Sequence, residues 1–143
     1  MLIAHVLREK GALVHTASAD ITLEEAAREL DRKGVGALVV LAENGAIAGV
    51  VSERDLVREV SRRGANCLSA PVKTVMSKDV VTARPSETID EGLARMTDRR
   101  IRHLPVIDDG RLVGIVSIGD LVKHRIAAVE AEAAAMQAYI ATH

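Results

Sequence analysis

The sequence almost lacks aromatic residues, with one Tyr, no Trp and no Phe among 143 residues. Because 48% of the residues are nevertheless hydrophobic, the core must be built from aliphatic side chains. Proteins that bind single-stranded nucleic acids stack bases on aromatic rings, and a net charge of -1 gives no field that attracts a polyanion. The composition therefore argues against nucleic-acid binding.

Cysteine and long apolar runs are also scarce. A single cysteine, Cys67, excludes an internal disulfide. No apolar run approaches the length of a membrane span, and His5 and Arg8 interrupt the N-terminal apolar residues before a signal peptide develops. We expect a cytoplasmic protein that does not associate with a membrane.

The chain contains an internal repeat, since the segment 14–56 returns as 80–121. Each copy predicts a short strand ending in Thr (Thr16, Thr82), a helix, two strands joined by a tight turn, and a second helix. Both first helices begin with Thr-x-x-Glu, a capping-box pattern, and both hairpins contain Asn-Gly or Asp-Gly. The sequence therefore predicts a mixed α+β or α/β fold made of tandem βαββα repeats with pseudo-two-fold symmetry.

This organisation predicts three regions. Residues 1–63 would form the first repeat with an N-terminal helix, residues 64–71 a linker of small and polar residues, and residues 72–143 the second repeat with a helical extension. That extension, from Leu121 to Ile140, has no Gly or Pro and should be one long C-terminal helix. Its apolar residues keep a spacing of three and four, so we expect a homodimer contact there.

Each repeat ends with Ser-x-x-Asp at the point where a glycine-led strand becomes a helix. These residues are Ser52 to Asp55 and Ser117 to Asp120. A helix N-terminus and a serine hydroxyl can donate to phosphate, and an ionised aspartate can accept from two ribose hydroxyls. The same residues could equally be two more capping boxes. Spacing alone leaves both interpretations open, whereas the symmetric position after a hairpin strand favours a nucleotide site.

These motifs are similar to those of the CBS domain family, whose tandem pairs share the βαββα repeat, the Gly-h-h-Ser/Thr-x-x-Asp ending and a His-h-Pro-Val strand. The resemblance covers nearly the whole chain. It is closest in the second copy, where Arg102-His103-Leu104-Pro105-Val106 matches the family strand. The first copy has Gly36-Ala37-Leu38-Val39-Val40 instead, and lacks the arginine on that strand.

The resemblance implies a non-catalytic sensor that binds an adenine nucleotide in the cleft between its repeats. AMP, ADP or ATP is the expected ligand, with NAD(H) or S-adenosylmethionine as alternatives. Ribose is expected on Asp55 and Asp120, with Asp120 favoured. The remaining expected site residues contact phosphate or adenine: Thr16, Ser52, Arg54, Thr82, Arg102, His103, Pro105, Ser117 and Ile118.

The sequence suggests neither a catalytic residue set nor a metal site. His5, His15, His103, His124 and His143 are dispersed without ligand spacing, and no nucleophile is paired with a base. We therefore expect a sensor that signals to a separate effector protein. The alternative is a dimeric interaction or structural module in which both Ser-x-x-Asp motifs only cap helices.

Overall fold

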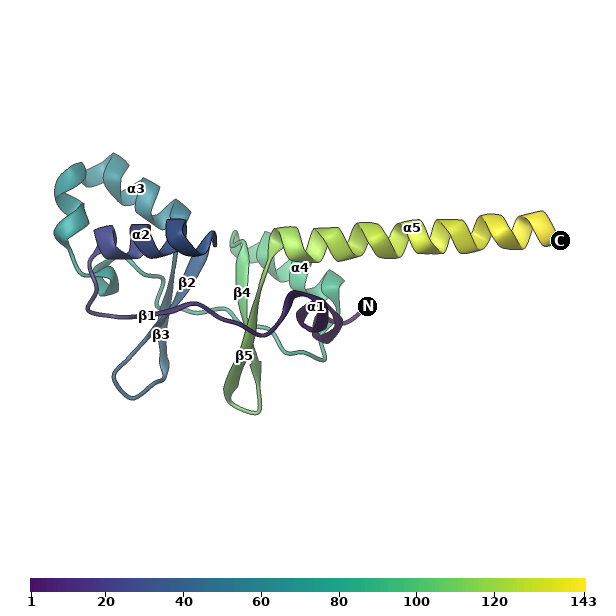
Figure 1. The fold of residues 1–143 in the computed structure, drawn as a ribbon, viewed down its shortest axis with the longest axis horizontal. Helices are drawn as coiled ribbons and strands as arrows, with labels where there is room; N and C mark the ends of the chain where they lie inside the picture. The colour runs from purple at the N-terminus through teal and green to yellow at the C-terminus, as the bar shows by residue number, and fades with distance from the viewer. The chain divides into compact units, whose positions relative to one another are not determined.

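The computed structural model describes all residues from 1 to 143 and divides the chain into two compact units (Figure 1). One unit is Val14–Val80, and the other combines Met1–Leu13 with Val81–His143. Each unit contains one copy of the repeat. The tandem mixed fold and its long C-terminal helix are therefore confirmed.

The unit Val14–Val80 is built around a three-stranded sheet in the order β1-β2-β3. Strand β1 is parallel to β2, and β2 is antiparallel to β3. The elements are β1 (Thr16–Ser18), α2 (Leu23–Lys33), β2 (Ala37–Leu41), β3 (Ile47–Ser52) and α3 (Glu53–Arg63). Two short 3-10 helices, η1 (Ala65–Ser69) and η2 (Val72–Thr74), follow.

The other unit has a two-stranded antiparallel sheet formed by β4 and β5. Its elements are α1 (Ile3–Lys10), α4 (Ile89–Arg99), β4 (His103–Asp108), β5 (Arg111–Ser117) and α5 (Ile118–Thr142). The predicted strand ending at Thr82 is reduced to a single parallel bridge between Ala83 and Val106. Pro85 follows two residues later and has no N–H with which to continue the ladder. In the first repeat, β1 begins rather than ends at Thr16.

Local signals placed the helix starts and the hairpin turns correctly. The Thr22 hydroxyl caps α2 by accepting from the Glu25 N–H at 3.1 Å, and the Thr88 hydroxyl caps α4 by accepting from the Glu91 N–H at 3.0 Å. Only this threonine half of each predicted box forms. Gly45 and Gly110 have positive φ angles at the two hairpin turns, as Asn-Gly and Asp-Gly predict.

Each unit has its own aliphatic core, as the lack of aromatic residues requires. In the first, the helix α2 packs Leu23, Ala26 and Leu30 against the sheet. The core of the other unit includes Leu104 and Val116 from the hairpin and Leu121 from the start of α5. All of these side chains are at most 4% exposed.

The N-terminal helix belongs to the second repeat, not to the first as the sequence suggested. Ile3 and Val6 of α1 are fully buried in the core that contains Leu104 and Val116. The backbone fixes the same contact, since Ile3 N–H donates to Glu87 C=O at 2.9 Å. No local sequence pattern indicates which sheet these apolar residues cover.

Residues 64–71 are also more ordered than the predicted linker. They contain η1, and the Cys67 side chain is fully buried in the core of the unit Val14–Val80. Pro71 forms a bridge with Thr22. The small residues of this segment therefore let it pack closely, and the boundary between the units falls after Val80.

Helix α5 is longer than a unit of this size needs. It runs for 25 residues, and every residue from Val129 to His143 is exposed. Figure 1 shows the C-terminal part of α5 extending away from the other elements of its unit. No helix of the structure has the length and apolar character required to cross a bilayer. The predicted single long helix is confirmed.

Gly49, on the strand that leads to Ser52, tests how closely this unit is packed. A Cβ atom there would lie 2.7 Å from the Ser77 carbonyl oxygen and 2.7 Å from Met76 Sδ. Since the backbone oxygen cannot move independently, we predict that Gly49→Ala lowers the free energy of unfolding by about 1–3 kcal/mol. Urea denaturation measures this change.

Gly119→Ala is the matched control. The nearest atom to its added Cβ would be the Ser117 hydroxyl oxygen at 3.7 Å, an ordinary contact. Alanine is also the better helix former, so this variant should be at least as stable as the wild type. Equal stabilities of the two variants would contradict the close packing at Gly49.

Candidate functional site

Both Ser-x-x-Asp motifs form complete capping boxes. At the start of α3, Ser52 Oγ accepts from the Asp55 N–H at 3.3 Å, and Asp55 Oδ2 accepts from the Ser52 N–H at 2.9 Å. At the start of α5, the corresponding distances for Ser117 and Asp120 are 3.1 Å and 2.8 Å. The capping role weighed from the sequence is therefore present at both places.

Capping leaves part of each carboxylate available. In both motifs the serine N–H uses only Oδ2. Asp55 Oδ1 lies 3.7 Å from the Arg58 guanidinium, and the Asp55 and Asp120 side chains are 15% and 28% exposed. A carboxylate has about four acceptor positions, so each aspartate keeps the capacity to accept from a ligand hydroxyl.

The surroundings of Asp55 and of Asp120, the two candidate half-sites, differ in a lysine contact. Lys10, at the end of α1, donates from Nζ to Asp120 Oδ2 at 2.6 Å and to the Ile115 carbonyl oxygen at 2.9 Å. Asp55 has no lysine partner. Sequence analysis missed Lys10, because it lies 110 residues from Asp120 and belongs to no motif.

Lys10 also changes the acidity of Asp120. Burial of the carboxyl raises its pKa, whereas the hydrogen bonds from Lys10 and Ser117 and the positive charge of Lys10 lower it more. The net pKa of Asp120 lies below that of an ordinary aspartate. The side chain is therefore a carboxylate at neutral pH, as an acceptor of ribose hydroxyls must be.

The β4–β5 hairpin brings several other predicted residues to Asp120. His103 pairs with Ser117 in the sheet, and the Ile118 N–H donates to the Arg102 carbonyl oxygen at 2.8 Å. Arg102 and Ile118 are exposed, and Pro105 is buried further along β4. The hairpin thus gathers Arg102, His103, Ser117, Ile118 and Asp120 at one end of this unit.

The first repeat has the same backbone arrangement but no arginine at the position that corresponds to Arg102. The Glu53 N–H donates to the Gly36 carbonyl oxygen at 3.0 Å, so Gly36 takes the place that Arg102 has in the second repeat. Ser52 pairs with Ala37, and the exposed Thr16 pairs with Val39 two residues further along β2. Arg54 is exposed in the first turn of α3.

A partly buried ion pair positions Thr82. Arg95 Nη1 donates to the Thr82 carbonyl oxygen at 2.9 Å, and Arg95 Nη2 lies 2.5 Å from Glu87 Oε2. Burial raises the pKa of Glu87, but the hydrogen bonds from Arg95 and from the Arg84 N–H lower it more, so the net pKa is lowered. The segment between Thr82 and Glu87 is therefore held against α4 by a charged contact.

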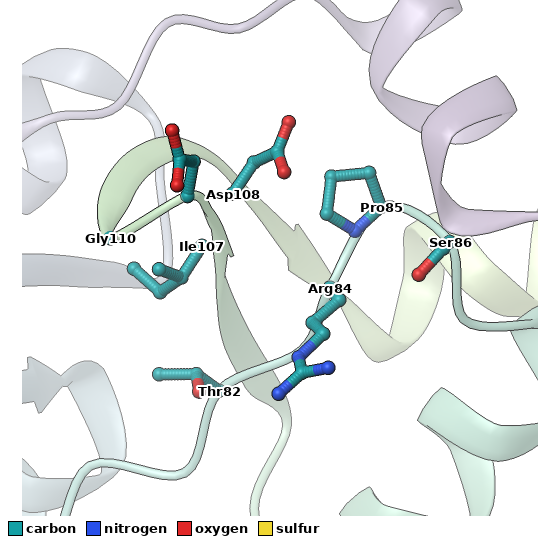
Figure 2. A pocket seen from close by; sticks show the side chains of 8 residues that line it. Thr82, Arg84, Pro85, Ser86, Ile107, Asp108 and Gly110 are labelled. Carbon is teal, nitrogen blue, oxygen red and sulfur yellow. The ribbon is translucent and has the colours of Figure 1, made fainter.

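The structure contains a pocket of about 750 Å³ that is separate from the residues gathered around Asp120 (Figure 2). It lies between the segment Thr82 to Ser86 and the turn from Ile107 to Gly110, at the opposite end of the hairpin from His103 and Ser117. In Figure 2, Arg84 extends beside Thr82 on one side of the pocket, and Asp108 lies on the other. Only Thr82 belongs to both this pocket and the predicted site.

Comparison with known proteins matches both repeats to one family. The model of the CBS domain matches residues 14–62 and 72–127. The chain belongs to the CBS domain family. CBS domain pairs are generally regulatory and bind adenosine-containing ligands, and the two matched segments make this chain such a pair.

Relatives of this CBS domain pair are found in plants and bacteria. It is 34% identical over 146 residues to the CBS domain-containing protein CBSX3, mitochondrial, of Arabidopsis thaliana, a match that covers 96% of this chain and 71% of that protein. The CBS-domain containing protein ATU1752 of Agrobacterium tumefaciens has a similar structure, with a TM-score of 0.85 and 41% identity over 87% of this chain and 92% of that one.

A second similar structure contains ligands. The CBS domain pair of protein MJ0100, in complex with 5'-methylthioadenosine and S-adenosyl-L-methionine, has a TM-score of 0.78 and 25% identity. The match covers 89% of this chain and 97% of that one. Both ligands of MJ0100 contain adenosine.

The ion pair of Lys10 and Asp120 should stabilise this CBS domain pair in a pH-dependent way. Because the folded-state pKa of Asp120 is lowered, its contribution is present above the unfolded-state pKa of about 3.9 and is lost as the pH falls through the lower folded-state pKa. We predict that Lys10→Met lowers the free energy of unfolding by about 1 kcal/mol at pH 7. The difference from the wild type should shrink below about pH 4, as measured by denaturation at several pH values.

Lys73→Met provides a surface control for this experiment. Lys73 pairs with Asp20 at 3.3 Å, but these side chains are 53% and 68% exposed. Its replacement should change stability by no more than about 0.5 kcal/mol. A Lys10→Met protein as stable as the wild type at pH 7, or a difference that persists unchanged in acid, would contradict the predicted linkage.

Proposed function

We propose that this CBS domain pair is a non-catalytic sensor of an adenine nucleotide, with the carboxylates of Asp55 and Asp120 as acceptors for ribose hydroxyls. The observation that carries the proposal is the fixed orientation of these two carboxylates and the hydrogen-bond acceptor capacity that they retain. Each is oriented by its own serine through Oδ2 and retains acceptor capacity. An acceptor fixed before the ligand arrives loses little conformational entropy on binding.

The other proposed contacts come from residues and helix N-termini near these two carboxylates. Ser52, Ser117 and the N-termini of α3 and α5 are suited to phosphate, because a helix start presents N–H groups and a positive dipole end. Arg54 and Arg102 are exposed near these starts and would add positive charge. Thr16, Thr82, His103, Pro105 and Ile118 are the proposed neighbours of the adenine and ribose.

AMP, ADP or ATP is the proposed ligand, with NAD(H) and S-adenosylmethionine as the alternatives. All of them contain adenosine, as do the two ligands of MJ0100. The proposed ribose contact is common to the whole set. The chemical group attached at the 5' position, which differs among them, would therefore decide the selectivity through the arginines and helix N-termini.

We propose that the sensor acts in the cytoplasm as a homodimer and signals to a separate effector protein. The exposed apolar residues of α5 support self-association. A ligand can shift an effector only if it binds two arrangements of the protein with different affinity. A second candidate function, an interaction module without nucleotide, is supported by the complete capping boxes, which account for both motifs without any ligand.

Titration calorimetry with AMP, ATP, NADH, S-adenosylmethionine and 5'-methylthioadenosine separates these two functions. We predict saturable binding of at least one compound, and a loss of about 1.5–3 kcal/mol of binding free energy in Asp55→Ala or Asp120→Ala. At a hundred times its dissociation constant the ligand should stabilise the wild type by about 2.7 kcal/mol. Asp108→Ala, at the other end of the hairpin, should bind as the wild type does.

Binding that is unaffected by either substitution would remove both carboxylates from the site. No binding of any compound to the folded protein would favour the interaction module. Because each aspartate also caps a helix, a thermal unfolding scan of every variant must accompany the titration. Loss of binding counts only where the variant is still folded at the temperature of the titration.

We further propose that the two carboxylates are not equivalent, and that Asp55 accepts the ligand more readily than Asp120. This reverses the preference drawn from the sequence. Lys10 already donates to Asp120 Oδ2, so a ribose hydroxyl must compete with an ammonium group there. The cation next to Asp55 is the Arg58 guanidinium, which lies 3.7 Å from Oδ1, beyond hydrogen-bond distance.

Replacing Lys10 tests whether its contact with Asp120 makes the ligand prefer Asp55. We predict that Lys10→Met strengthens binding to the half-site of Asp120 by about tenfold, equivalent to 1.4 kcal/mol, and leaves binding that depends on Asp55 unchanged. The measurement is titration of Lys10→Met in the Asp55→Ala background, with Asp55→Ala alone as reference. Weaker binding of phosphorylated ligands after the substitution would instead make Lys10 a phosphate contact and overturn the proposed competition.

A further inference from the structure

The C-terminal part of α5 has no contact that explains its persistence as a helix. From Val129 to His143 every residue is exposed, and this part extends beyond α1 and α4 of its own unit (Figure 1). A helix of this length is marginally stable by itself in water. Continuity with the anchored start of α5 helps, but the exposed apolar side chains remain in water.

The exposed apolar residues of α5 follow a heptad pattern. Intervals of four and three residues alternate along a stripe that we call the α5 seam: Val122, Ile126, Val129, Ala133, Met136 and Ile140. The five larger side chains are between 40% and 67% exposed. If Ile126 is an a position and Val129 a d position, every member of the seam is an a or a d residue, which is the pattern of a coiled coil.

The residues that flank the seam carry charges of both signs. In this heptad frame Arg125 is a g position, Glu130 an e position and Glu132 a g position. In a parallel pair, a g residue faces the e residue of the next heptad on the other helix. Arg125 would therefore meet the partner subunit's Glu130, and the symmetry of the pair gives this contact twice.

An antiparallel pair would bring like charges together. In the register that overlaps the whole seam, Ala133 lies against the partner's Val129 and Ile126 against the partner's Met136. Glu130 would then face the partner's Glu130, and Glu132 the partner's Glu132. Flanking charges set the orientation of coiled coils, and here they favour the parallel one.

From the seam and its charges we infer that two copies of this chain pair through α5 as a parallel, in-register coiled coil from Val122 to Ile140. This rests on the homodimer proposed above, and not on nucleotide binding. Arg125 is available for the contact, since its side chain is 51% exposed and its ion pair with Asp90 is a surface one at 3.4 Å. Ala133, small and central in the seam, lets the two helices approach closely.

Light scattering of the full chain tests the seam. The wild type is expected to be a dimer, and the double variant Val129→Glu, Met136→Glu a monomer, with the dimer dissociation constant raised at least about a hundredfold. Ala131→Glu, Ala138→Glu is the matched control, since both residues are f positions on the face opposite the seam and should leave the dimer intact. A monomeric wild type, or a dimer that survives the seam substitutions, would overturn the proposal.

Folding is checked in the same samples. The seam residues substituted here are exposed, so the thermal midpoint of the two units should stay near that of the control variant. Nucleotide titration of the monomeric variant then separates the two proposals. Binding without dimerisation supports the sensor alone, and dimerisation of a wild type that binds no nucleotide supports the seam alone.

Oxidative cross-linking tests the parallel orientation. A disulfide needs Cα atoms within about 7 Å, which residues 126 and 140 satisfy with their own copies only in a parallel, in-register pair. Ile126→Cys and Ile140→Cys, made separately, should each give a covalent dimer. The wild type should give none, because Cys67 is fully buried. A stable dimer in which neither variant cross-links would overturn the parallel arrangement.

Discussion

The start of a helix leaves backbone N–H groups without partners, and in this protein α3 and α5 meet that requirement in the same way. A serine caps the helix and the aspartate three residues later returns a hydrogen bond to the serine N–H. The exchange fixes one oxygen of each carboxylate at the end of a hairpin strand, β3 or β5. Capping and ligand binding are therefore compatible, because the bond that stabilises the helix also holds the acceptor in place.

The N-terminal helix packs against only one of the two repeats. Burial of Ile3 and Val6 fixes α1 against the second repeat, and this in turn carries Lys10 to Asp120. Only one of two similar carboxylates thus acquires an ammonium partner. The asymmetry arises from packing outside the repeat, so two motifs with the same serine and aspartate need not have the same affinity for a ligand.

Features set by neighbouring residues were predictable, and those set by distant contacts were not. The caps at Ser52 and Ser117 and the turn at Gly110 depend on spacings of a few residues. The docking of α1 and the Lys10 contact depend on which apolar surface is left uncovered after both sheets form, which no local pattern encodes. The reduced strand near Ala83 was predictable only in part. Pro85 is visible in the sequence, but whether it shortens the strand depends on which residue pairs with Val106.

The site at Asp120 and the α5 seam belong to one helix. Asp120 is in the first turn of α5, and Val122, the first seam residue, follows two residues later. Helix α1 holds this part of α5 through Lys10 and through Glu9, which lies 3.3 Å from His124. A ligand that displaces Lys10 must weaken one of these two contacts. Suppose that the affinity between two α5 seams depends on whether Lys10 contacts Asp120 or is displaced from it. Then by linkage the ligand changes dimer affinity, and dimerisation changes ligand affinity by the same factor.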